Sequence, residues 1–228
     1  MFAGLTGITE AGLKQWIEDS LASHSNILAA GYQGQTLEYK DANYHLVIKV
    51  PHGRGLLKRF HISMLRHENQ VYQHLAEFPA IPHCYGLVDK QYLVLEFVQG
   101  HPFRTQRPEN EAVFFTAFLQ NIHDMHAMGV AHFDLKKRDN LLVIDGKTPC
   151  LIDFGAAIIQ KQGFHPLNSF LFNMASRFDY NAWIKLKYNN QFQLISEEDR
   201  QYYNKTLTEI VSRKIKRFYK DSILKLFK

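Results

Sequence analysis

The sequence predicts an α+β fold in which a β-rich N-terminal part precedes a mostly helical C-terminal part. Short apolar segments typical of strands predominate before residue 98, and longer helical segments predominate after residue 110. A chain of 228 residues is long enough for one large domain or for two small lobes that share a cleft. The apolar share of 46% and the charged share of 21% are those of an ordinary globular protein, which excludes a disordered chain.

Composition also limits the partners and the location of the protein. The net charge of +5 favours an anionic partner, such as a nucleotide, a nucleic acid, a phosphorylated sugar or a lipid surface, and charge alone does not choose among them. No apolar run reaches the roughly 18–20 residues that span a bilayer, and the N-terminus lacks the features of a signal peptide. We therefore expect a cytoplasmic protein, with Cys84 and Cys150 as buried free thiols.

The N-terminal part is expected to contain two helices and five short strands. The first helix has an apolar stripe opposite its charges, and the second has apolar residues spaced by three and four. The helices are expected at residues 9–21 and 56–78, and the strands at 27–30, 36–39, 46–50, 81–88 and 91–98.

Lys49 and Glu68 are the first residues that point to a site. Alternation places Lys49 on the face of its strand opposite to Leu46 and Ile48. A lone lysine in a short apolar strand is usually an edge residue whose charge stays in water. Glu68, however, falls on the apolar stripe of the second helix, where an unpaired carboxylate is costly to bury. The sequence therefore predicts an ion pair between these two side chains.

Residues 132–155 place two carboxylates and one asparagine beside apolar strands. Two β-prone segments flank the turn signal Asp145-Gly146, which predicts a hairpin. That hairpin would carry Asn140 and Asp153 at neighbouring strand ends. Their oxygen atoms are ligands that Mg²⁺ accepts together with phosphate, which leaves Asp134 to accept a proton.

These motifs resemble those of the protein-kinase-like superfamily. The run His132, Asp134, Lys136 and Asn140 resembles its catalytic loop, and Asp153-Phe154-Gly155 resembles its metal-binding motif. The thirteen residues from Asn140 to Asp153 are a separation typical of that family, as are the nineteen between the lysine and glutamate described above.

The resemblance covers residues 27–160 and implies a two-lobed protein-kinase-like fold. A small β-rich N-lobe would comprise residues 1–98, and a mostly helical C-lobe would comprise residues 99–228, with a hinge at Gln99-Gly100. The C-lobe would be shortened, because only 73 residues follow Gly155 and no Ala-Pro-Glu motif marks the end of an activation segment.

The resemblance assigns catalysis and metal binding to the loop. Asp134 would orient and deprotonate the acceptor hydroxyl, Lys136 would steady the transferred phosphoryl group, and Asp153 with Asn140 would hold Mg²⁺. The family places the asparagine five residues after the catalytic aspartate, whereas Asn140 comes six after it and Asp139 occupies the fifth place. The Leu-Leu-Val run after Asn140 favours Asn140 as the ligand, with Asp139 as the alternative.

The resemblance also assigns the ATP site. Lys49, held by Glu68, would bind the nucleotide phosphates, and the backbone around Glu96 would meet the adenine. Gly31 and Gly34 would form a loop whose amides approach the phosphates, although an ordinary hairpin turn explains these two glycines equally well.

After Gly155 the sequence predicts further helices. They are expected at residues 168–174 and 179–187, with another beginning at 196–199. Asp179 would either brace the catalytic loop, as an acidic residue does in kinases, or cap its own helix. The basic amphipathic segment at 205–228 would pack under the C-lobe or contact a membrane surface.

The resemblance implies an ATP- and Mg²⁺-dependent phosphotransferase, and it leaves the acceptor open. The short C-lobe resembles that of small bacterial kinases of lipopolysaccharide-core sugars and of RIO-type kinases, whereas Lys136, two residues after Asp134, resembles Ser/Thr protein kinases. We expect an anionic glycolipid, with a protein as the alternative, possible contact with the inner membrane and no nucleic acid. A catalytically silent nucleotide-binding protein is a further alternative.

Overall fold

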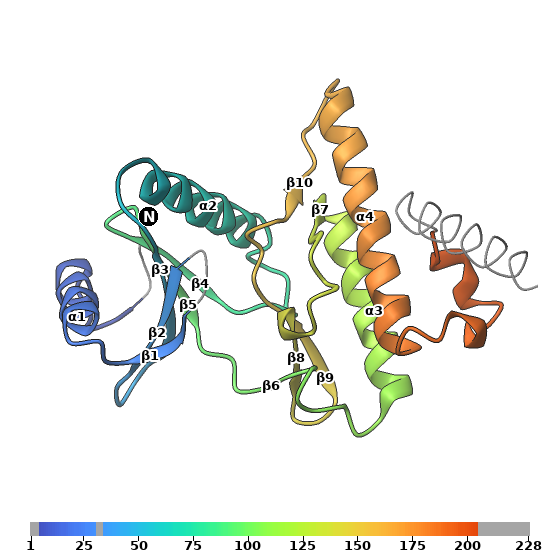
Figure 1. The fold of residues 1–228 in the computed structure, drawn as a ribbon, viewed down its shortest axis with the longest axis horizontal. Coiled ribbons are helices and arrows are strands. Elements are labelled where there is room, and N and C mark those ends of the chain that lie inside the picture. Colours follow the sequence, from blue (N-terminus) through green and yellow to red (C-terminus); the bar gives the residue numbers. More distant parts are fainter. Residues whose placement is uncertain (1–4, 31–33, 205–228) are drawn as a thin grey trace, which may run out of the picture.

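The computed structural model describes residues 5–30 and 34–204 (Figure 1). A five-stranded sheet with two helices forms the N-terminal region, and two helices with two small sheets dominate the C-terminal region. The division into lobes at residues 98 and 99 stays a prediction. The basic segment expected at residues 205–228 lies outside the described residues.

The five strands of the N-terminal sheet are all antiparallel to their neighbours, in the order β1-β2-β3-β5-β4. They are β1 (Ile27–Ala30), β2 (Gly34–Lys40), β3 (His45–Pro51), β4 (Cys84–Val88) and β5 (Tyr92–Glu96). The fourth strand begins three residues later than expected, since Pro82 has no N–H to donate to a strand ladder.

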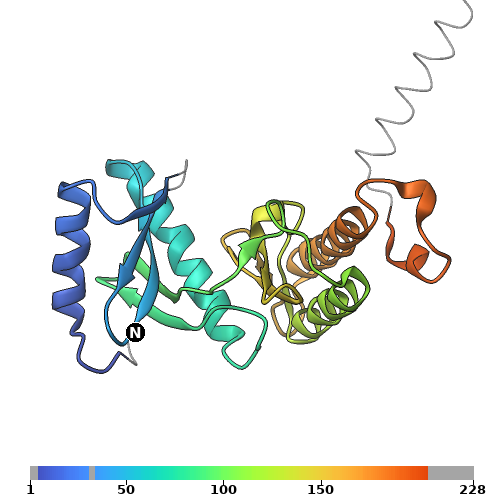
Figure 2. The ribbon, with the colours of Figure 1, turned by 90° about the horizontal axis from the view of Figure 1, so that it is seen from below.

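Two helices cover the opposite faces of this sheet (Figures 1 and 2). On one face, Leu13 and Ile17 of α1 (Glu10–Ala22) pack against the apolar residues of β2 and β3. On the other face, Val71 and Tyr72 of α2 (Gly55–His74) join a core cluster that includes residues of β5. The alternation along β3 therefore directs Leu46, Ile48 and Val50 toward α1 and leaves Val47 and Lys49 on the side of α2.

The C-terminal region is built around α3 (Glu111–Ala127) and α4 (Pro166–Lys187), which pack side by side (Figure 1). The strands β6 (His101–Pro102), β8 (Leu141–Ile144) and β9 (Thr148–Leu151) form one small sheet, and β7 (Val130–Ala131) pairs with β10 (Ile158–Ile159). The short 3-10 turns are η1 (Arg138–Asn140), η2 (Phe192–Leu194) and η3 (Asp199–Tyr202).

Two expectations about the C-terminal helices are wrong. The helices expected at 168–174 and 179–187 are one continuous helix, because the residues between them include no helix breaker. Asp179 is therefore not a helix cap. The helix expected from 196–199 is the short turn η3, in which the Ser196 hydroxyl accepts a hydrogen bond from the Asp199 N–H (3.2 Å).

The two cysteines are free thiols with raised pKa values. Burial raises the pKa of Cys84 to about 11 and that of Cys150 to about 12. At pH 8 we expect only about one Cys84 in a thousand to be a thiolate, and fewer of Cys150. A colorimetric thiol reagent should therefore label neither residue until the protein unfolds. Rapid labelling of the native protein would contradict this expectation.

None of the helices in the described part of the chain is both long and apolar enough to cross a bilayer.

Candidate active site

Lys49, Glu68 and Asp153 form a chain of ion pairs between the two regions. Lys49 Nζ lies 2.6 Å from Glu68 Oε1 and 2.9 Å from Asp153 Oδ1. Glu68 Oε1 also accepts a hydrogen bond from the Phe154 N–H (3.2 Å). The predicted pair between the strand and α2 is present, and it extends to a residue 104 positions further along the chain.

Each charged group among Lys49, Glu68 and Asp153 shifts the pKa of its neighbours. Burial lowers the pKa of Lys49, but the carboxylates of Glu68 and Asp153 outweigh it, so that the pKa lies above the ordinary value. Burial raises the pKa of Asp153, and the Lys49 ammonium outweighs that effect and lowers the pKa below its ordinary value. Lys49 is therefore protonated and Asp153 ionised at neutral pH.

Asp179 of α4 holds the loop that leads to Asp134. The Asp179 carboxylate accepts hydrogen bonds from the backbone N–H groups of His132 and Phe133 (both 2.8 Å) and from Nε2 of His126 (3.0 Å). Phe133 has φ of +68°, a conformation that costs a non-glycine residue energy unless its surroundings hold it there. Asp179 thus braces the loop, as one of the two interpretations of the sequence expected.

The predicted hairpin brings Asn140 and Asp153 to neighbouring strand ends. Strands β8 and β9 pair across the Asp145-Gly146 turn, where both residues have positive φ. Beyond the paired strands, the Ile152 N–H donates to the Asn140 carbonyl (3.0 Å). Asn140 is buried, and its Nδ2 donates to the Asp134 carbonyl (3.1 Å), which leaves its side-chain oxygen available as a ligand.

Asp139, the alternative ligand, faces away from this site. Its carboxylate lies 2.9 Å from the guanidinium of Arg104, and its side chain is half exposed. The turn η1 therefore directs Asn140 inward and Asp139 outward, which favours Asn140 as the ligand.

Lys137 is the residue that the sequence reasoning missed. Its Nζ lies 2.5 Å from Asp134 Oδ2, and the neighbouring carboxylate raises the pKa of Lys137. Lys136 is exposed, and no side-chain hydrogen bond or ion pair involves it within residues 5–30 and 34–204. A loop has no fixed periodicity, so the spacing from Asp134 did not reveal which lysine turns toward it.

His67 and His132 are two further residues that the sequence reasoning left without a structural role. His67 of α2 donates from Nε2 to the Ala157 carbonyl (2.8 Å), which fastens α2 to the segment after Gly155. His132 is buried and donates from Nε2 to the Ile152 carbonyl (3.0 Å). A polar residue beside a predicted site residue was the available signal in both cases.

Besides Lys49 and Glu68, the structure describes two of the residues expected near ATP, Gly34 and Glu96. Gly31 lies outside the described residues. Gly34 begins β2, and a Cβ atom there would lie 2.0 Å from the Val50 carbonyl oxygen, so the close approach of two strands explains this glycine. The Glu96 carboxylate accepts a hydrogen bond from the His83 N–H (3.0 Å) and thus ties β5 to the start of β4.

We expect Gly34→Ala to lower the free energy of unfolding by about 1–3 kcal/mol, because the added methyl group overlaps a backbone oxygen. Urea unfolding of the protein without nucleotide measures this loss. An unchanged midpoint would show that β2 and β3 separate freely at this point.

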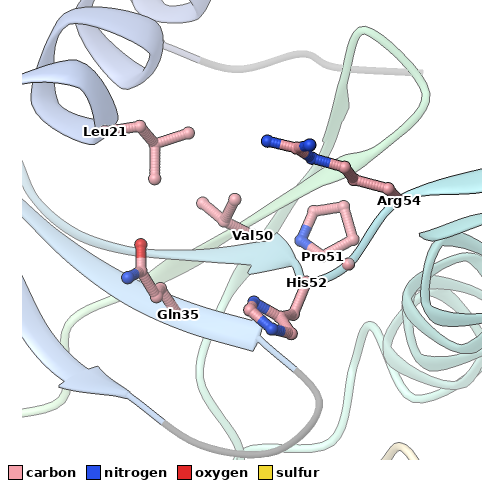
Figure 3. A pocket seen from close by; sticks show the side chains of 7 residues that line it. Leu21, Gln35, Val50, Pro51, His52 and Arg54 are labelled. Carbon is pink, nitrogen blue, oxygen red and sulfur yellow. The ribbon is translucent and has the colours of Figure 1, made fainter. Parts of the chain in front are cut away.

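A shallow pocket of about 390 Å³ lies on the other side of the sheet (Figure 3). Leu21 of α1, Gln35 of β2 and Val50 of β3 face it, together with His52 and Arg54 from the loop before α2. Val50 follows Lys49 in the strand and points to the opposite face. This pocket is therefore separate from the chain of ion pairs.

Comparison with known proteins identifies the fold. No protein-family model and no curated protein matches the sequence. Among solved structures, the chain is similar to the Rio2 kinase–ADP/Mg²⁺–phosphoaspartate complex from Chaetomium thermophilum, with a TM-score of 0.55. The fold is protein-kinase-like. The similarity covers 90% of this chain and 72% of that one at 14% sequence identity, which shows a shared fold and not a shared activity.

In this kinase-like fold, the described residues suit a nucleotide phosphate and a magnesium ion. The Asp153 side chain is 35% exposed, so its carboxylate can contact a ligand in addition to its contact with Lys49. Mg²⁺ commonly binds one or two protein oxygen ligands and completes its shell with phosphate and water. Asp153 and the side-chain oxygen of Asn140 match that requirement, and the Lys49 ammonium supplies a positive charge for phosphate.

Proposed function

We propose that the protein is an ATP- and Mg²⁺-dependent phosphotransferase that moves the γ-phosphate to a hydroxyl group of a lipopolysaccharide-core sugar. The observation that carries this proposal is the convergence of Lys49, Glu68 and Asp153 through ion pairs of 2.6 and 2.9 Å. A partly buried lysine between two carboxylates contributes little to stability and is well suited to bind phosphate. An N-lobe at residues 1–98 and a C-lobe at 99–228 would meet there.

Each residue has one task in this proposal. Lys49, held by Glu68, binds the phosphates, and Asp134 orients the acceptor hydroxyl and takes up its proton. Lys136 steadies the transferred phosphoryl group. Bound to Asp153 and Asn140, Mg²⁺ would offset the negative charge of the phosphates.

The loop residues around Asp134 supply the positioning. Lys137 holds the Asp134 carboxylate at 2.5 Å, and Asp179 fixes the backbone of the preceding residues. Correct positioning of two reactants provides much of the rate in phosphoryl transfer.

A sugar acceptor is favoured over a protein acceptor by the charge of the chain. The net charge of +5 suits an anionic glycolipid. A Ser/Thr protein kinase is the second candidate, because Lys136 stands two residues after Asp134 as in those enzymes.

The decisive experiment supplies the purified full chain with radiolabelled ATP and Mg²⁺. We expect transfer to dephosphorylated lipopolysaccharide core and none to a panel of proteins, with Lys49→Met as the inactive control. Site-specific labelling of a serine or threonine, without transfer to the core sugar, would promote the second candidate. No ATP turnover with any acceptor would refute the phosphotransferase.

The metal ligand has its own test. We expect Asn140→Ala to raise the Mg²⁺ concentration needed for half-maximal turnover by about 10–100-fold. Even residues that only orient a metal ligand change metal affinity by about that factor when they are replaced. Asp139→Ala is the matched control and should change it by about twofold at most, as for other exposed positions. The reverse order would move the ligand to Asp139.

A further inference from the structure

The most exposed large apolar side chains are confined to two stretches of the chain. Within the described residues, five such side chains are at least 61% exposed, and all of them lie between positions 56 and 60 or between 164 and 170. They are Leu56, Phe60, Phe164, Leu167 and Phe170. Single exposed apolar residues need no explanation, whereas clustered ones mark a contact surface.

The second stretch forms a row along α4 that ends at the catalytic loop. Leu167, Phe170, Met174 and Phe178 are spaced by three or four residues, so they share one side of the helix. The Phe178 ring packs edge-on against that of Phe133 at 5.4 Å, and the next residue after Phe133 is Asp134. This α4 row therefore connects the exposed tip of α4 to the candidate site.

The first stretch forms a row on α2. Leu56, Phe60 and Met64 share a side of the helix with His67. His67 contacts the Ala157 carbonyl, so this α2 row lies on the side of the helix that faces the segment after Gly155. In Figure 1, α2 and the beginning of α4 lie along the same upper edge of the molecule, with β10 between them.

The two chain segments that contain the rows carry positive charge and no carboxylate. None of the 22 Asp and Glu residues of the chain occurs at positions 51–67 or 154–178. These two ranges nevertheless contain six Lys and Arg residues, at positions 54, 58, 59, 66, 161 and 177. Arg54 faces the pocket on the other side of the sheet and Arg66 donates to the Lys90 carbonyl, which leaves Lys58, Arg59, Lys161 and Arg177 as the basic residues beside the rows. Apolar side chains with basic residues beside them are typical of helices that lie in the interface of an anionic membrane.

We infer that the α2 row and the α4 row together rest on an anionic lipid surface. The inference deepens the proposed function and rests on it for its purpose, since a glycolipid acceptor is presented at such a surface. The apolar side chains enter the interface, the basic residues meet the anionic headgroups, and the α4 row leads from the surface to Asp134.

Vesicle binding by the full chain, without nucleotide, tests this inference. We expect binding to vesicles of equal parts phosphatidylglycerol and phosphatidylcholine, and much weaker binding to pure phosphatidylcholine. The double variant Leu167→Ser/Phe170→Ser should bind the anionic vesicles about 10–100-fold more weakly, because two large apolar side chains no longer leave water. The matched control is Val113→Ser/Leu194→Ser, whose wild-type side chains are 56% and 60% exposed outside both rows, and it should bind as the wild type does.

Three kinds of outcome would overturn the inference. The first is vesicle binding that does not differ, either between the two double variants or between the two kinds of vesicle. The second is loss of binding when residues 205–228 are removed, with Leu167→Ser/Phe170→Ser unaffected, which would assign the contact to that segment. The third is a dimer in light scattering that Leu167→Ser/Phe170→Ser dissociates, which would make the surface an interface between copies. Vesicle binding that persists in a protein unable to phosphorylate core sugar would refute the proposed function instead.

Discussion

Asp134→Asn is expected to lower turnover by about 10²–10⁴-fold, the range for the loss of a positioned general base. The amide keeps the shape of the carboxylate but cannot take up the proton of the acceptor hydroxyl. It also carries no charge, so it cannot form an ion pair with the Lys137 ammonium. Nucleotide binding should persist, because the ion pairs of Lys49 with Glu68 and Asp153 do not involve Asp134. Steady-state kinetics and calorimetric titration with Mg-ATP measure the two effects separately.

The matched control for this substitution is Asp139→Asn. Asp139 lies five residues further along the same loop, and its carboxylate pairs with Arg104 at the surface. We expect turnover within about twofold of the wild type, as for other exposed positions. Equal losses in the two variants would mean that the loop tolerates neither change, and that Asp134 has no special role in proton transfer.

Asp179→Ala is expected to lower the free energy of unfolding by about 3–5 kcal/mol, the usual range for breaking a buried charged network from one side. The carboxylate is fully buried and accepts three hydrogen bonds, two from backbone N–H groups of the loop that leads to Asp134 and one from His126. Alanine leaves these donors without partners in a place that water does not reach. The strained backbone at Phe133 also loses its restraint, so turnover should fall as well.

Chemical denaturation followed by circular dichroism measures this loss, and Asp124→Ala is the control. Asp124 is an exposed aspartate of α3 that accepts one side-chain hydrogen bond, from Gln120 (2.8 Å). We expect its removal to change stability by about 0.5 kcal/mol at most. A comparable effect of both substitutions would argue against Asp179 as the brace of the loop.

The sequence predicted most elements of the N-terminal region, because alternation and helical periodicity report directly on which face is buried. The pair of Lys49 and Glu68 followed from the cost of burying a single carboxylate. The third member, Asp153, was predicted as a metal ligand, but its contact with Lys49 depends on how two distant regions pack. No local pattern contains that information.

The predictions for the C-terminal region were less accurate for two physical reasons. The break expected within α4 was placed between two apolar stretches, although a helix needs a breaker or a cap to end. In the loop after Asp134, side-chain direction follows the irregular backbone of the turn at Arg138–Asn140 and not a repeating pattern. The pairing of Lys137 with Asp134 was therefore overlooked.

The contact between Lys49 and Asp153 has a thermodynamic consequence for ligand binding. As long as the two side chains are paired, Lys49 neutralises part of the charge that would attract a cation to Asp153, and Asp153 neutralises part of the charge that would attract a phosphate to Lys49. A phosphate that binds Lys49 weakens its hold on Asp153 and frees that carboxylate for a cation, and a cation at Asp153 frees Lys49 for phosphate in return. Linkage requires the two affinities to rise by the same factor, so nucleotide and metal should bind with positive cooperativity.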